Sequence, residues 1–299
     1  MVESILLYAG FVLILVGTLS LVYPLRWLRI PTRGAALLVV ATGFLVVAIA
    51  AGMVDSFLVY FGFTLFLAGL LSLIRPLRFV YIRTRFVALL VAGAGVLLAV
   101  GVLLLPCSER EAATCVTKID DWMPRWQVGE RHAIHVAATP EKVFAAIHAV
   151  RADDILLFRT LIAIRRCGQT GPESILNAPE EKALLDVATQ TTFMLLEEET
   201  ARELVIGTVI AAPRAVRASG PLTPELFRKT LPPGVVLATM NFHVAADAQG
   251  GSSVSTETRI FANASFALRR FAVYWRVIHP GSDIIRRTWL RAIKRRAEG

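Results

Sequence analysis

The first third of the chain contains the same pattern twice. A stretch that begins at Ser4 recurs without a gap at a shift of 52 residues. The matching pairs are Tyr8/Tyr60, Gly10/Gly62, Phe11/Phe63, Gly17/Gly69, Ser20/Ser72, Pro24/Pro76, Arg26/Arg78, Thr32/Thr84 and Arg33/Arg85. Each copy consists of an apolar run, a short basic segment and a second apolar run. A fixed period of this size indicates one supersecondary unit that is used twice.

The apolar runs are long enough to cross a bilayer. Residues 4–23, 34–54, 57–74 and 86–105 contain no Asp, Glu, Lys or Arg, and each run has 18 to 21 residues. At ~1.5 Å per helical residue, such a run spans roughly the 30 Å hydrocarbon core. We therefore expect residues 1–105 to be an all-α transmembrane region of four helices, built from two-helix repeats at 4–55 and 56–105. Because the first run recurs internally, it is not expected to be a cleaved signal peptide.

Arginines in the short loops predict the orientation. The turn around residue 55 carries only Asp55, whereas the two basic loops carry Arg26, Arg29, Arg33, Arg75, Arg78, Arg83 and Arg85. The positive-inside rule places both basic loops at the cytoplasmic membrane surface. The expectation is an integral protein of the cell membrane, with membrane lipids as partners and an extracytoplasmic C-terminal domain.

The apolar runs contain no ionisable residue, which argues against ion-coupled transport, since proton and ion relays need intramembrane acids or histidines. They are rich in glycine and alanine, which allow helix backbones to approach closely. A lipid-binding groove between the two helix pairs is an alternative use of this region.

Residues 106–129 have the polar composition of a linker. Cys107 and Cys115 lie in this segment, and a disulfide between them would suit an oxidising exterior. The alternative is two thiols in a connecting segment.

From residue 130 the pattern becomes that of a mixed α and β domain. Thr139 and Pro140 are typical of a helix start. Ser282 is expected to cap a last helix that follows a break at Pro280-Gly281. The expected strands are 130–138, 193–199, 203–210, 235–246 and 252–261, and the expected helices are 139–147, 153–166, 180–193 and 282–296.

This order of elements, with the phrase Ala137–Ile147 and the tail Thr256–Arg287, resembles the START-like helix-grip superfamily, which includes the SRPBCC, polyketide cyclase/dehydrase and lipid-transport families. The resemblance covers about 170 residues, from 130 to 299. It implies an α+β domain in which an antiparallel sheet wraps a long C-terminal helix around an apolar cavity for a hydrophobic ligand. Within the tail, Tyr274 and Trp275 are candidate ligand-binding residues.

Charge and motif content exclude several functions. The net charge is +9, but residues 106–299 hold 25 basic and 21 acidic residues and thus contribute only 25 − 21 = +4. With no nucleic-acid-binding motif, no nucleic-acid partner is expected. His132 and His135 lie on opposite faces of a strand and cannot share an ion, so no metal and no cofactor is expected.

Four polar residues on two neighbouring strands are the best candidates for a site. Asn241 and His243 share one strand face, and so do Glu257 and Arg259. If these faces line a cavity, the side chains would orient a ligand. The alternative is that Glu257 and Arg259 form a structural ion pair.

The sequence thus predicts a membrane-anchored protein that binds a lipid or another hydrophobic small molecule. One alternative is an enzyme of the cyclase or aromatase type, with Glu257 and His243 as acid and base. The other is an assembly protein whose START-like domain holds no ligand. The basic face of the last helix (Arg286, Arg287, Arg291, Lys294, Arg295 and Arg296) would either contact anionic lipid or be solvated.

Overall fold

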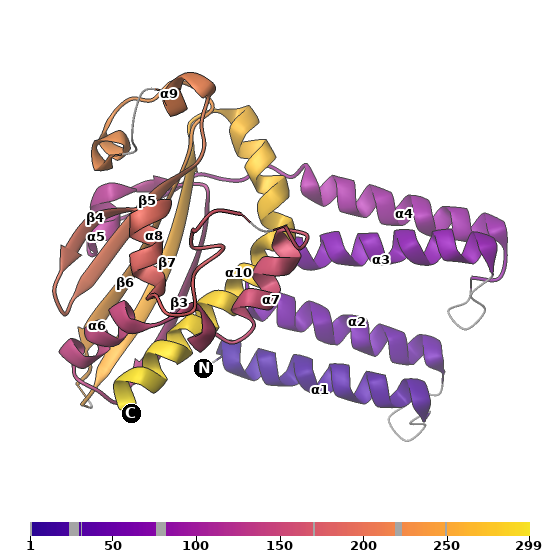
Figure 1. The fold of residues 1–299 in the computed structure, drawn as a ribbon. Helices are drawn as coiled ribbons and strands as arrows, with labels where there is room; N and C mark the ends of the chain where they lie inside the picture. Colours follow the sequence, from indigo (N-terminus) through magenta and orange to yellow (C-terminus); the bar gives the residue numbers. More distant parts are fainter. Residues whose placement is uncertain are drawn as a thin grey trace. The chain divides into compact units, whose positions relative to one another are not determined.

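The computed structural model describes residues 2–23, 30, 32–75, 82–169, 171–218, 223–248 and 250–299. The chain divides into two compact units (Figure 1). The first consists of Met1–Leu105 with Trp275–Pro280, and the second of Pro106–Tyr274 with Gly281–Gly299.

The first unit is helical. Its helices are α1 (Val2–Val22), α2 (Arg33–Ala50), α3 (Val54–Ile74) and α4 (Arg85–Leu103). Among the described residues, α2, α3 and α4 are long and apolar enough to cross a membrane, which identifies a membrane protein. The described apolar part of α1, Ile5–Leu21, is shorter than the length that this criterion requires.

The repeat seen in the sequence returns in the packing of the helix pairs. A Cβ atom on Gly10 of α1 would lie 2.9 Å from the Gly43 carbonyl oxygen of α2. At the shifted position, a Cβ atom on Gly62 of α3 would lie 2.8 Å from the Gly95 carbonyl oxygen of α4. Helix backbones approach this closely only where side chains are small. Both copies therefore form the same close-packed helical hairpin.

The helix starts repeat as well. The Thr32 hydroxyl accepts a hydrogen bond from the Ala35 amide at 3.2 Å, and the Thr84 hydroxyl accepts one from the Val87 amide at 3.2 Å. Each threonine is the N-cap of the second helix of its hairpin.

The second unit contains a five-stranded antiparallel sheet in the order β3-β7-β6-β5-β4. The strands are β3 (Val128–Val136), β4 (Met194–Glu199), β5 (Glu203–Ala211), β6 (Val236–Ala246) and β7 (Ser252–Ala262). Both predicted hairpins are present, and β6 and β7 pair in register from Val236↔Ala262 to Ala246↔Ser252.

The two faces of the sheet are covered differently. On the inner face, α6 (Pro140–Ala149), α8 (Leu184–Thr191) and the last turns of α10 (Ser265–Glu298) pack against the sheet around Phe242 and Trp289 (Figure 1). On the outer face, α5 (Lys118–Trp122) packs against the sheet through Ile119 and Trp122. A smaller two-stranded sheet joins β1 (Arg110–Glu111) to β2 (Arg125–Trp126).

The remaining elements are short. They are η3 (Ala152–Asp154), α7 (Phe158–Arg165), α9 (Arg214–Ala218) and η4 (Pro224–Arg228). The amphipathic run expected at 153–166 thus corresponds to η3 and α7.

Two expectations differ from the structure. Residues 106–129, expected as a linker, belong to the second unit and contain β1, α5, β2 and the start of β3. The expected break at Pro280-Gly281 is wrong, because α10 continues through Pro280 as one helix of 34 residues. Ser282 is therefore inside a helix and is not an N-cap. Figure 1 shows that α10 bends along its length, as a helix with an internal proline does.

Candidate functional site

A cavity of about 360 Å³ lies on the outer face of the sheet. Four chain segments form it, and aromatic and aliphatic side chains make up most of its lining. The lining residues are Trp122, Met123, Pro124, Arg125, Phe227, Lys229, Thr230, Leu231, Val235, Leu237, Phe261 and Asn263. We call this space the outer cavity. Its volume lies within the range of roughly 300–1,000 Å³ that is usual for small-molecule sites.

The floor of the outer cavity comes from the sheet. Leu237 of β6 and Phe261 of β7 are register partners and share the outer face. Val235 and Leu237 are buried in an apolar cluster with Met123, while Phe261 packs against that cluster. A floor of this kind offers an apolar ligand contact and no hydrogen-bonding atom.

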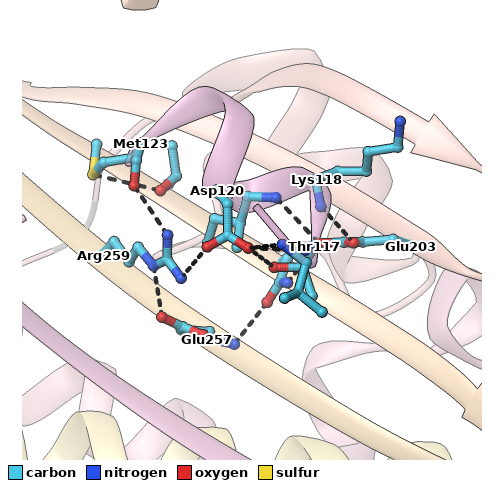
Figure 2. Close-up of polar contacts among 11 residues, drawn as sticks. Thr117, Lys118, Asp120, Met123, Glu203, Glu257 and Arg259 are labelled. Atoms are coloured by element: carbon cyan, nitrogen blue, oxygen red, sulfur yellow. Dashed lines mark hydrogen bonds and ion pairs between the residues drawn. The ribbon is translucent and has the colours of Figure 1, made fainter. Parts of the chain in front are cut away.

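The first wall is the end of α5 with the residues that follow it, and a buried arginine holds this wall on the sheet. The Arg259 guanidinium lies 2.7 Å from Asp120 Oδ1 and 2.6 Å from Glu257 Oε1 (Figure 2). It also donates a hydrogen bond to the Met123 carbonyl oxygen at 3.0 Å, and Trp126 covers it with its ring centroid 3.9 Å away. The Arg259 side chain is 5% exposed. Arg259 therefore ties β7 to the wall residue Met123.

A second set of contacts fixes the N-terminal end of α5. Glu203 of β5 accepts hydrogen bonds from the Lys118 amide at 2.8 Å and the Ile119 amide at 3.3 Å. Asn241 donates to Glu203 Oε1 at 2.7 Å and accepts from the Glu257 amide at 2.8 Å. A carboxylate at the free amides of a helix start is stabilising. Glu203 and Asn241 thus position α5 over the sheet.

Asp120 links these contacts and is ionised in this environment. Burial alone would raise the pKa of its carboxyl group, but hydrogen bonds from the Thr117 amide, Arg259, the Thr117 hydroxyl and the Val116 amide outweigh burial. The pKa of Asp120 is consequently below its ordinary value. The charged form is the one that holds α5.

The second wall is formed by the end of η4 and the residues after it. Gly207 of β5 makes room for this wall, because a Cβ atom there would lie 2.5 Å from the Phe227 ring. Asn263 fixes the other end: its Nδ2 donates to the Leu231 and Pro232 carbonyl oxygens, and its Oδ1 accepts from the Gly234 and Val235 amides. The wall is therefore held at both ends.

Of the four polar residues predicted to form a site, the structure brings three together. Asn241, Glu257 and Arg259 form one network, but it lies under α5 and supports the cavity wall, and none of the three lines the cavity. His243 lies on β6 with Asn241, is half-buried, and is in register with Glu203 and Ser255. The ring of Tyr274 packs against Phe271 and Arg165, while Trp275 stacks on His279.

The other predicted residues were cysteines and loop arginines. Cys107 is half-buried and Cys115 is exposed, and no disulfide joins them. Arg33, Arg83 and Arg85 are exposed, whereas Arg26, Arg29 and Arg78 lie outside the described residues. Within the described part of the chain, no group of three or more His, Cys, Asp or Glu side chains has the geometry of a metal site.

A separate polar cluster lies on the inner face, between β3 and α10. His132 Nε2 is 3.6 Å from Glu130 Oε2 and 3.5 Å from Asp283 Oδ1, and all three side chains are at most 7% exposed. Arg286 lies 3.7 Å from Glu130, and Ser282 donates a hydrogen bond to the same carboxylate at 2.5 Å. These contacts hold α10 on the sheet.

The basic residues of the last helix do not form the single lipid-facing or solvated face that the sequence predicts. Burial lowers the pKa of Arg286, against the opposing charge of Glu130, so this residue is part of the domain's interior. Asp154 accepts from Arg295 and Arg296, and Lys294 donates to the His135 carbonyl oxygen. Arg291 is exposed.

Sequence reasoning missed the residues that line the outer cavity. Trp122 and Met123 stand in the segment that was expected to be a linker, and Phe227 and Leu231 stand in a stretch for which no element was expected. The available signal was Thr117 with Asp120 three residues later, which is the spacing of a capping box, followed directly by the apolar Trp122 and Met123. Comparison of the chain with protein-family models, curated proteins and solved structures gives no match.

Proposed function

We propose that this membrane protein carries a START-like domain that binds a lipid or another hydrophobic small molecule in the outer cavity. The observation that carries the proposal is a cavity of about 360 Å³ lined by Trp122, Phe227 and Phe261. Concave apolar sites with few polar groups are typical of small-molecule binding. The polar network around Arg259 supports the same reading, since it fixes one wall in place before any ligand arrives.

The family resemblance implies a ligand on the inner side of the sheet, whereas the outer cavity lies on the opposite side. On the inner side, between the sheet and α10, Phe242 and Trp289 are almost completely buried, and their rings pack edge to face with centroids 5.1 Å apart. The core side chains thus occupy the inner side at this point. The outer cavity offers the ligand an apolar surface on the opposite face.

The enzyme alternative has less support. Its proposed acid, Glu257, accepts a hydrogen bond from Arg259 and is 16% exposed beneath α5. Glu257 is thus held in an ion pair under α5, and it is not among the residues that line the outer cavity. The assembly alternative would be favoured if the outer cavity were closed by a partner protein.

A direct test is native mass spectrometry of the full chain purified in lipid nanodiscs. We expect a bound hydrophobic molecule to remain on the wild type and to be lost from Leu231→Trp, which places an indole in the cavity. Leu156→Trp is the matched control, because Leu156 is 63% exposed and does not line the cavity. Equal occupancy in Leu231→Trp and wild type would contradict the proposal.

For the membrane region, we propose four spans, with α1 as the fourth and the second unit outside the cytoplasm. The support is the repeat, because α1 packs on α2 through the same glycine positions that join α3 to α4. Phosphatase reporters fused at Asp55 and at the C-terminus should both be active. An inactive C-terminal fusion with an active Asp55 fusion would overturn the orientation.

A further inference from the structure

The charged groups that line the outer cavity are both cations. Arg125 and Lys229 belong to different walls, and none of the described lining residues is acidic. Lys229 is exposed, and the Arg125 side chain is 59% exposed, so both lie where the cavity opens to solvent. The cavity therefore joins an apolar, aromatic interior to a positively charged opening.

The two cations remain available to a ligand. Arg125 pairs with Glu109 at 3.6 Å, and Glu109 also accepts a hydrogen bond from Gln127 at 3.0 Å. Lys229 forms no hydrogen bond or ion pair with any residue that the structure describes. Its charge acts on the exposed Glu225, whose pKa is lowered chiefly by a threonine hydroxyl and also by Lys229. An exposed pair such as Arg125–Glu109 contributes little and can exchange partners at small cost.

The other polar lining groups are mostly occupied. The Asn263 amide uses both its oxygen and its nitrogen on the backbone of Leu231–Val235. The Met123 carbonyl oxygen accepts from Arg259. Thr230 is exposed, and its hydroxyl is a further polar group in the described lining. Recognition by this cavity must come from apolar contact and positive charge.

We infer that the ligand is a single-chain anionic amphiphile, such as a fatty-acid anion, with its chain against Trp122, Phe227 and Phe261 and its anionic group at Arg125 and Lys229. This inference rests on the proposed function and adds the ligand class. The volume is near the lower end of the range for small-molecule sites, which favours one chain.

The test uses the full chain in nanodiscs of zwitterionic lipid and three probes with the same photoreactive chain: decanoate, decanol and decyltrimethylammonium. After irradiation, labelled peptides are quantified by mass spectrometry. Labelling of the peptides that carry Trp122–Arg125 and Phe227–Leu237 is divided by labelling of α2–α4, which corrects for partition of each probe into the bilayer. Decanoate is expected to label the cavity peptides more strongly than decanol, and decyltrimethylammonium least.

Charge-reversal variants sharpen the result. Lys229→Glu and Arg125→Glu should each lower decanoate labelling about three- to five-fold, the effect expected for one exposed ion pair, and should raise labelling by decyltrimethylammonium. Lys142→Glu on α6 is the matched control and should leave both signals unchanged, because Lys142 is exposed and does not line the cavity.

The outcomes separate the two proposals. If decanol labels the cavity as strongly as decanoate and the charge reversals change nothing, the anionic ligand class is wrong and hydrophobic binding stands. If no probe labels the cavity peptides above the level in Leu231→Trp, the proposed function fails together with the inference. Displacement by decyl phosphate as well as by decanoate would extend the class from carboxylates to phosphate monoesters and would support the inference.

Discussion

The two units of this protein bring chain segments together by opposite means. In the helical hairpins of the first unit, backbone meets backbone, since Gly62 and Gly95 leave no side chain between α3 and α4. In the second unit, α5 is held on the sheet by buried charged side chains around Arg259. The first kind of contact fails when atoms are added, and the second fails when atoms are removed.

The difference follows from the surroundings of each unit. Apolar helices in lipid gain little from burying more apolar surface, so their contacts depend on close van der Waals packing. A short helix in water, such as α5, cannot hold its conformation alone. It needs partners for its free amides, and Glu203 and Asp120 supply them.

The largest effect is expected when the buried arginine is removed. Arg259→Ala leaves Asp120 and Glu257 as buried charges without their cation, and breaking such a pair typically costs about 3–5 kcal/mol. This loss of stability is measured by denaturant unfolding with tryptophan fluorescence as the signal, since Trp126 lies over Arg259. The control is Arg291→Ala, an exposed arginine of α10, which should change stability by less than about 0.5 kcal/mol. Similar losses in the two variants would show that the network does not stabilise the second unit.

A smaller effect is expected when a side chain is added to the first unit. In Gly62→Leu the new Cβ atom would lie 2.8 Å from the Ala99 amide nitrogen, so α3 and α4 must separate. Overpacking of this kind costs typically 1–3 kcal/mol. Gly93→Leu is the matched control on α4, because no atom lies within 4 Å of the added Cβ. Thermal unfolding of the full chain in detergent compares them.

The same experiment checks the independence of the units. Gly62→Leu should lower the midpoint of the helical transition and leave the fluorescence transition of the second unit where it is. Gly10→Leu, at the equivalent position of the first repeat, should act in the same way. If only one of the two glycine variants is destabilised, the repeats do not pack alike.

The architecture of the first unit was largely predictable because one physical signal determines it. Runs without charge predicted the helices, and a period of 52 residues predicted that Thr32 and Thr84 have equivalent roles. In the second unit, alternation predicted both hairpins and the shared face of Glu257 and Arg259. The alternation of apolar and polar residues did not predict which face of the sheet each helix of the domain would cover.

The candidate site was less predictable because its covering element looked like a linker. Residues 106–129 are polar and contain two cysteines, and a helix of five residues has too short a pattern to be recognised. The break expected at Pro280 failed for another reason. A proline removes one helical hydrogen bond, and the burial of Trp289, Leu290 and Ile293 on the sheet offsets that loss.

The smallest effect concerns acid, which should separate the units without any mutation. The pKa of Asp120 is lowered in the folded state, so the stability that it contributes is present above its unfolded pKa of about 3.9 and is lost as pH falls through the folded value. The pKa of Glu197 is lowered too, chiefly by its hydrogen bond with Lys118 and then by Trp122. Residues 1–105 contain only Glu3 and Asp55 as acids. Below about pH 4, the fluorescence transition of the second unit should therefore shift before the helical transition does.

Two variants test whether Asp120 causes this pH dependence. Asp120→Asn should make the stability of the second unit less dependent on pH, whereas Asp121→Asn, at the neighbouring exposed position, should leave the dependence as it is. An acid response that is equal in the two units, or unchanged in Asp120→Asn, would mean that Asp120 does not hold α5 through its charge.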